Sequence, residues 1–277
     1  MDEKKEEIVV EAGRLGRLYW QDLWRHRELF LFLAWRDIAV RYKQTMLGVA
    51  WSAVRPLVSM VVFTVVFGKI ASLPPDGGAP YAVMVFAALL PWQFFANSLP
   101  IAANSIIGGA NLVSKVYFPR LIIPVAALGT GIVDLLVSLV VLGGMMAWYG
   151  FCPPFRALFL PFPLLLAILF TAGCGVLSSA LCVKWRDVRV IVPFVVQIGL
   201  YVSPVGFSSS VVPERWRWLY DCNPMVAVID CCLWCLIPGA AAPGASTIWT
   251  GVAVTLFVLV FGIRCFRSIE RSFADTI

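Results

Sequence analysis

Charged residues are scarce in this sequence, and their scarcity excludes most water-soluble folds. Only 14% of the 277 residues are charged and 60% are hydrophobic, whereas a soluble domain has about 25% charged residues. So little polar surface cannot cover a soluble globule, and so much apolar surface excludes intrinsic disorder. We therefore expect an all-α integral membrane protein with several apolar helices of about 20 residues each.

Catalytic and nucleotide-binding motifs are also absent. The single histidine, His26, excludes histidine-rich metal sites and serine–histidine catalysis within the membrane. The sequence contains no GxxxxGK[ST] phosphate-binding loop, no GxSxG nucleophile motif and no HExxH motif. We expect a chain that has no catalytic site and binds no cofactor or metal itself. A membrane-embedded transferase is a distant alternative, because it would need clustered polar residues at depth.

Eight cysteines are present, but their pattern indicates no specific site. Most lie in apolar stretches, where cysteine behaves as a small hydrophobic residue. Cys232 and Cys235 form a CxxC pair without a second pair to complete a metal site, and a disulfide of Cys222 stays open. The acidic start, Met1 to Glu11, lacks the features of a signal peptide, so we expect it to stay in the cytoplasm.

Hydropathy divides the chain into an N-terminal region, 1–47, and a six-span region, 48–277. In the first region a basic face opposite Tyr19, Trp20, Leu23 and Trp24 predicts an amphipathic helix at the membrane interface, or one packed on protein. The segment 211–238 is apolar only from Pro224 to Ile237, about 14 residues, which is too short to cross and contains Asp230, so the segment is predicted to be re-entrant. The six predicted spans are about 48–70, 81–107, 121–149, 158–183, 190–207 and 247–263.

The basic residues fix the orientation of these spans. Of the 22 lysines and arginines, nine precede the first span, two lie between spans two and three, three between spans four and five, and three follow span six. Four lie on the opposite side and Arg55 lies within a span. Because cytoplasmic loops are rich in Lys and Arg, both termini are predicted to be cytoplasmic. The net charge of +6 is thereby explained by topology and indicates no nucleic-acid partner.

Two charged residues lie inside the predicted spans, Arg55 and Asp134. An acid within a span is costly and needs a partner, so Asp134 is interpreted as part of a buried structural pair, with Arg55 as one candidate. A role in a proton or substrate pathway is the alternative. Among the many aromatic residues, Trp92-Gln93-Phe94-Phe95 lies within a span, where aromatic rings could stack on sugars rather than anchor the chain in lipid.

Several motifs resemble the ABC type-2 exporter permeases for polysaccharides, most closely the O-antigen and teichoic-acid branch. The similarity runs from about residue 29 to the last span. It rests on Trp35 to Gly48 with Trp51 and Pro56, Leu90 to Phe95, Leu112 to Arg120, Val183 to Arg189, Ser203-Pro204-Val205 and Asn223-Pro224-Met225. The acidic N-terminus and the cysteines at 231–235 are not part of the pattern.

The resemblance implies a six-span homodimer with an N-terminal interfacial helix and re-entrant helices between spans five and six. Two copies of a separate ATPase subunit would bind ATP and magnesium, and the substrate would be a glycan linked to an undecaprenyl-pyrophosphate-type lipid in the bacterial inner membrane. It places the translocation pathway at Trp51, Trp92, Phe95 and Tyr201, the lipid-headgroup entrance at Arg36, Arg41 and Lys43, and the ATPase contact at Lys115, Tyr117 and Arg120. A capsular polysaccharide, a teichoic acid or a small molecule is the alternative substrate.

Overall fold

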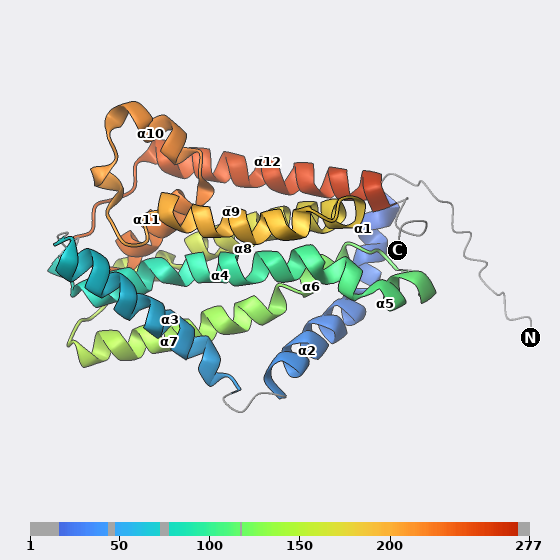
Figure 1. Ribbon diagram of the computed structural model, residues 1–277, viewed down its shortest axis with the longest axis horizontal. Coiled ribbons are helices and arrows are strands. Elements are labelled where there is room, and N and C mark those ends of the chain that lie inside the picture. Colours follow the sequence, from blue (N-terminus) through green and yellow to red (C-terminus); the bar gives the residue numbers. More distant parts are fainter. Residues whose placement is uncertain (1–16, 44–47, 73–77, 117, 271–277) are drawn as a thin grey trace, which may run out of the picture.

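A computed structural model describes residues 17–43, 48–72, 78–116 and 118–270, and these ranges form helices without strands (Figure 1). The N-terminal helices are α1 (Arg17–Arg25) and α2 (Arg27–Lys43). The bundle contains α3 (Ala50–Phe63) with its π-helical continuation η1 (Thr64–Ile70), α4 (Tyr81–Gly108), α5 (Ala110–Lys115), α6 (Ile122–Ala126), α7 (Gly129–Trp148), η3 (Phe155–Phe159), α8 (Pro161–Lys184), α9 (Val188–Val202), η4 (Ser209–Val211), α10 (Glu214–Asp221), α11 (Pro224–Leu236) and α12 (Ala245–Glu270).

Helix α4 forms the centre of the bundle. It contacts α3, α7, α8, α9 and α11, which surround it in Figure 1. In its most apolar stretch 78% of the residues are buried, compared with 6% for α3 with η1. The side chains of Val83, Phe86 and Leu89 on α4 lie in the main hydrophobic core. Helix α4 is therefore shielded by its neighbours, whereas α3 leaves most of its surface uncovered.

Five helical segments are long and apolar enough to cross a membrane, namely Ala50–Ile70, Tyr81–Gly108, Ile122–Trp148, Phe155–Lys184 and Ala245–Glu270. The predicted fifth span, 190–207, contains the shorter helix α9, whose 15 residues measure about 22 Å at 1.5 Å per residue. It ends at Val202 because Ser203 precedes Pro204, which favours the extended conformation seen at Ser203 (φ −91°, ψ 151°). The helix runs beside α4, antiparallel to α8 (Figure 1).

The segment between α9 and α12 bends sharply, as either a broken span or a re-entrant element would, so the re-entrant assignment stays a prediction. Helices α10 and α11 meet at an angle of 100°, and both lie at the end of the bundle where α9 ends and α12 begins (Figure 1). Asn223 caps α11 by accepting a hydrogen bond from the Met225 amide at 3.1 Å. The carboxylate of Asp230 accepts hydrogen bonds from the Ser209 hydroxyl at 2.6 and 2.7 Å, which shields its charge from an apolar environment.

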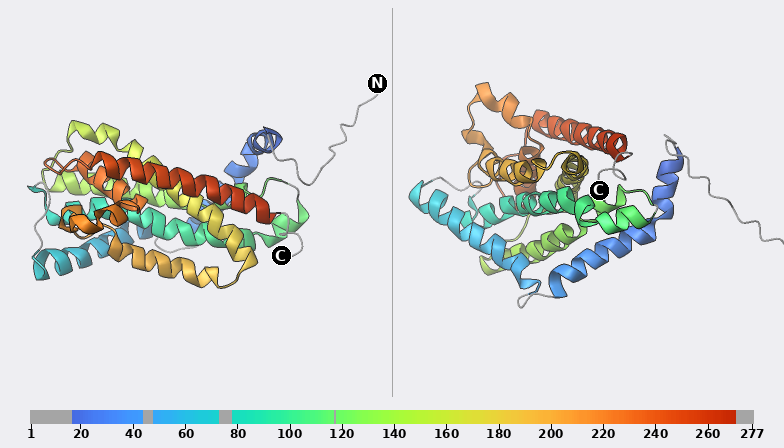
Figure 2. Two further views of the ribbon diagram at one scale, coloured as in Figure 1. Left: turned by 90° about the horizontal axis from the view of Figure 1, so that it is seen from above. Right: turned by 45° about the vertical axis from the view of Figure 1, so that its right-hand side comes forward.

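The N-terminal region forms two helices, α1 and α2, rather than a single interfacial helix (Figure 2). The aromatic face of α1 divides between two environments. Tyr19 and Leu23 pack against a second hydrophobic cluster, while Trp20 and Trp24 remain 49% and 73% exposed. Helix α1 is therefore partly packed on protein and partly available to the membrane surface.

Candidate functional site

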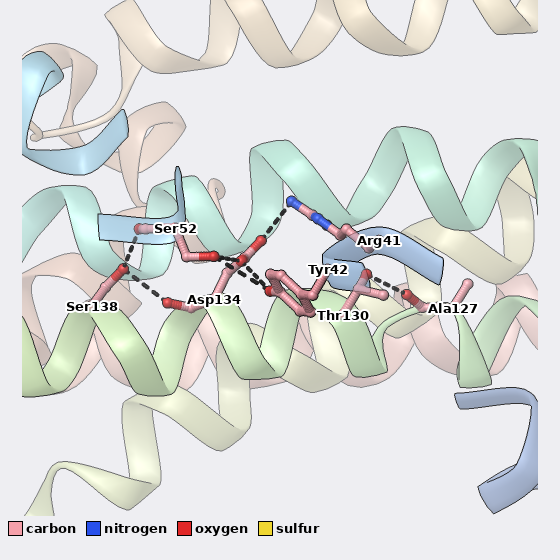
Figure 3. Close-up of polar contacts among 7 residues, drawn as sticks. All are labelled: Arg41, Tyr42, Ser52, Ala127, Thr130, Asp134 and Ser138. Atoms are coloured by element: carbon pink, nitrogen blue, oxygen red, sulfur yellow. Dashed lines mark hydrogen bonds and ion pairs between the residues drawn. The ribbon is translucent and has the colours of Figure 1, made fainter. Parts of the chain in front are cut away.

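Asp134 on α7 is the centre of a polar cluster that joins three helices (Figure 3). Its Oδ2 lies 2.7 Å from the Arg41 guanidinium. Its Oδ1 accepts hydrogen bonds from the Tyr42 hydroxyl at 2.6 Å and from the Ser52 hydroxyl. Ser138 donates to the Asp134 backbone carbonyl at 2.8 Å. The end of α2 and the start of α3 are thereby tied to the middle of the bundle.

The partner of Asp134 is thus Arg41 and not Arg55, which the sequence offers as one candidate. Arg41 lies at the end of α2 and reaches α7, whereas Arg55 lies on α3 with its side chain exposed. Burial, followed by the hydrogen bond to Asp134, raises the pKa of the Tyr42 hydroxyl, so this group stays protonated and donates. The buried carboxylate therefore has a counter-charge and hydrogen-bond donors, as a charge in a low-dielectric environment requires.

A cavity and a groove adjoin this cluster. The cavity has a volume of about 100 Å³ and borders Asp134, and the groove, about 460 Å³, runs between α3 and α9 over α4. Both are lined by Trp51, Arg55, Gln93 and Asn97. A tryptophan and an arginine of α3 and two amide side chains of α4 therefore face one continuous region of the α3–α4 surface.

The four predicted pathway residues occupy different environments. Trp51 and Trp92 both line the groove. Phe95 is buried behind Trp92, with its ring 5.5 Å from the Trp92 ring and stacked at 5.4 Å on Phe170. Tyr201 is 68% exposed on α9 and does not belong to the lining of the groove. The structure thus brings together two of the four.

Trp92 is held in place by a close approach of α9. A Cβ atom at Gly199 would lie 2.7 Å from the Trp92 ring, so only glycine leaves room for the indole in this position. The ring itself is 3% exposed. Trp92 therefore forms the floor of the groove, whereas Trp51, 45% exposed, stands at its side.

The predicted headgroup entrance lies at the end of α2. Arg36 pairs with the neighbouring Asp37 at 2.8 Å, and Arg41 pairs with Asp134. Lys43 is exposed at the last position of α2. Two of these three cations are thus already balanced by carboxylates within the chain.

The predicted ATPase contact follows α5. Lys115 is exposed, whereas Tyr117 lies outside the described residues. Arg120 is half-buried and bound to the end of α12, because its amide donates to Glu270 Oε1 at 3.2 Å and its Nη1 donates to the Glu270 carbonyl at 2.8 Å. Each side chain therefore binds the other residue's backbone, and we call this reciprocal pair the 120–270 clasp.

A second hydrophobic cluster surrounds the clasp. Phe266 of α12 is fully buried there, together with Phe118 and Val113 of the segment after α4 and Leu33 of α2. The Arg267 guanidinium lies 4.4 Å from the centre of the Tyr19 ring on α1. The predicted ATPase contact is thus packed with both N-terminal helices and the end of α12 in one small core.

Cysteines and metal-binding groups contribute no site in the described part of the chain. No three His, Cys, Asp or Glu side chains are placed there to hold a metal ion. Cys222 is free and exposed, whereas Cys231, Cys232 and Cys235 are free and buried on α11. The three buried cysteines pack as small apolar residues on α11.

Sequence reasoning that takes each polar residue by itself misses that Gln93 and Asn97 line the same cavity and groove as Arg55. Their spacing of four places them on one face of α4, and this helical periodicity is the signal that could have found them. Ser52 and Tyr42 lack such a signal, since their contacts with Asp134 join distant segments.

Comparison with known proteins places this geometry in a family. Residues 28–237 match the family described as ABC-2 type transporter. The chain is similar to "O-antigen export system permease protein RfbA" of Klebsiella pneumoniae, with 26% identity over 251 residues that cover 90% of this chain and 94% of the relative. The Myxococcus xanthus protein of the same name is 24% identical over 261 residues, covering 93% and 98%. "Inner membrane transport permease YadH" of Escherichia coli strain K12 is 23% identical over 231 residues, covering 79% and 87%. Since the family match spans well over half of the chain, this protein belongs to the ABC-2 type transporter family.

Proposed function

We propose that this chain is the permease subunit of an ATP-driven exporter that moves a lipid-linked polysaccharide of the O-antigen type across the bacterial inner membrane. Family membership and the relatives named as O-antigen export permeases support this function. The observation that carries it here is the groove in which Trp51 and Trp92 meet Arg55, Gln93 and Asn97. Aromatic faces and polar groups together suit a glycan, which presents both C–H faces and hydroxyl groups.

The groove also supports a homodimer with the pathway between its two copies. Only 6% of the most apolar stretch of α3 and η1 is buried, although this segment carries the exposed Arg55. Charged side chains in a span face a bundle interior or water rather than lipid. A second copy that covers α3 and α9 would enclose the two grooves and exclude lipid from them.

ATP hydrolysis would take place on two copies of a separate subunit that binds ATP and magnesium. The absence of a phosphate-binding loop in this sequence is consistent with that division. The ATPase would dock at the segment around Lys115, which is exposed beside the second hydrophobic cluster. Movement of this segment would pass to α1, α2 and α12, which pack on the same cluster.

The shared location of α1 and the last turn of α12 supports one orientation of the chain in the membrane. Helix α1 and the last turn of α12 lie at the same end of the bundle, opposite α10 and α11 (Figure 1). With the basic loops on the cytoplasmic side, both termini are cytoplasmic and the re-entrant helices face outward. Lys43 at the end of α2 then lies where an undecaprenyl-pyrophosphate-type headgroup would approach from the inner leaflet.

Deletion of the gene tests this function directly. Cells that lack the permease should accumulate lipid-linked glycan in the cytoplasm and lose it from the surface, because synthesis continues while export stops. Plasmid-borne wild-type protein should restore both quantities. Glycan extracts and surface labelling measure them, and an unchanged cytoplasmic pool in the deleted strain would contradict glycan export.

A further inference from the structure

Arg55 is a cation without a carboxylate partner in the described part of the chain. The ion pairs there are Arg36 with Asp37 and Arg41 with Asp134, and none includes Arg55. Arg55 lies on α3, within the span Ala50–Ile70. An arginine in a membrane span normally marks a functional contact, because its charge must be compensated.

A second copy of this chain would not supply the missing carboxylate from its spans. Helices α3, α4, α7, α8, α9 and α12 contain two acids, namely Glu270, which is bound to Arg120 at the end of α12, and Asp134. Its oxygens are already engaged by Arg41, Tyr42 and Ser52. The acids of the described spans are thus engaged, which leaves a ligand or the membrane as the source of a counter-charge for Arg55 within the span.

The surroundings of Arg55 favour a ligand that offers oxygen acceptors. The guanidinium presents five N–H donors in a planar fork, which fits phosphate oxygens. Gln93 and Asn97 add amide donors, and these three side chains line both the cavity and the groove. Trp51 and Trp92 contribute apolar surface to the same groove, suited to the carbon skeleton next to a charged group.

We propose that Arg55, together with Gln93 and Asn97, binds the phosphate oxygens of a phosphate or diphosphate ester carried on a lipid. The proposal rests on the proposed function and refines it. It assigns the charged part of the substrate to the groove, one to two turns into α3, instead of to Arg36 and Arg41, whose charges are already paired within the chain. Trp51 and Trp92 then contact the sugars that follow the diphosphate.

Binding of farnesyl diphosphate to the purified permease in phosphatidylcholine nanodiscs tests this subsite. Titration calorimetry should detect binding to the wild type that is at least about tenfold weaker in Arg55→Gln, as expected for a lost charge-assisted hydrogen bond. Arg55→Lys should bind with intermediate affinity, since it keeps the charge and loses the planar fork. Lys69→Gln, an exposed cation at the far end of the same helical segment, is the matched control and should bind as the wild type does.

Two further titrations identify the source of the phosphate. Farnesol should not bind, and inorganic diphosphate should compete weakly if the lipid chain contributes. If inorganic diphosphate binds as tightly as farnesyl diphosphate, the phosphate site remains but its ligand is soluble. If farnesyl diphosphate no longer binds in phosphatidylglycerol nanodiscs, the site is occupied by the phosphate groups of bulk phospholipid. Equal affinity in the wild type and Arg55→Gln, with circular dichroism showing both folded, would overturn the proposal. Such a result would leave the export function untouched, because that function is tested by the glycan pools of the deleted strain.

Discussion

At the scale of single residues, Asp134 shows how a membrane protein tolerates a buried acid. Its carboxylate is balanced by Arg41 and receives hydrogen bonds from Tyr42 and Ser52. Removal of one member of a buried ion pair leaves the other charge uncompensated, which costs more than the pair itself contributes. The cluster therefore makes the position of α2 and of the start of α3 depend on a single side chain of α7.

Asp134→Asn should lower the free energy of unfolding by about 2 kcal/mol, less than the roughly 3–5 kcal/mol for breaking a fully buried pair, because the Arg41 side chain is 26% exposed. The double variant Asp134→Asn with Arg41→Gln should regain part of this loss, since no uncompensated charge remains. Denaturant unfolding in detergent micelles measures both. Asp187→Asn, on an exposed acid before α9, is the matched control, and equal stabilities of the single and double variants would contradict the charge argument.

At the scale of secondary-structure elements, the 120–270 clasp connects the segment after α5 with the end of α12. Arg120 donates both hydrogen bonds, one from its backbone amide to the Glu270 side chain and one from its side chain to the Glu270 carbonyl, so exchange of the two residues would not restore them. The adjoining core of Phe118 and Phe266 holds the same two elements together. A force applied at Lys115 would therefore reach α12 through fixed contacts rather than through a loose loop.

Glu270→Ala should increase amide hydrogen exchange in residues 109–121 and reduce export per ATP hydrolysed, because the Arg120 amide loses its acceptor. Glu270→Gln keeps an oxygen acceptor and should restore most of both properties. Exchange is measured by mass spectrometry on the permease, and coupling by the ratio of glycan exported to phosphate released in cells or vesicles. Arg264→Ala, an exposed cation on α12, is the control. If Glu270→Ala and Arg264→Ala behave alike in both measurements, the clasp does not position the segment.

At the scale of the whole molecule, burial is distributed unevenly among the helices. Helix α4 is shielded on all sides, and α8 and α12 approach so closely that a Cβ at Gly262 would lie 2.6 Å from the Gly173 carbonyl oxygen. Helices α3 and α9 instead leave large apolar side chains exposed beside the groove. Large apolar side chains are also exposed on α7, α8 and α12, so the outer surface of the bundle is apolar on several sides, as expected for a membrane protein.

Hydropathy predicts the five apolar spans, because lipid imposes length and composition on each segment separately. The contacts between segments do not follow from hydropathy. Tyr42 and Asp134 are 92 residues apart, and nothing local selects Arg41 over Arg55 as the ion-pair partner. The break of the N-terminal helix before Arg27 and the early end of α9 likewise depend on local geometry that periodicity does not capture.

We expect the groove between α3 and α9 to be the path of the exported glycan. The most direct test uses cells that lack the gene and carry the Trp51→Ala variant on a plasmid. It measures the ratio of surface glycan to cytoplasmic lipid-linked glycan in these cells. This side chain is exposed, so its removal should leave folding intact, while the ratio should fall about fivefold, equivalent to roughly 1 kcal/mol of lost aromatic contact. Trp148→Ala, at an 87% exposed tryptophan outside the groove, should keep the wild-type ratio at equal protein level. A wild-type ratio for Trp51→Ala, or equal losses for both variants, would contradict the account.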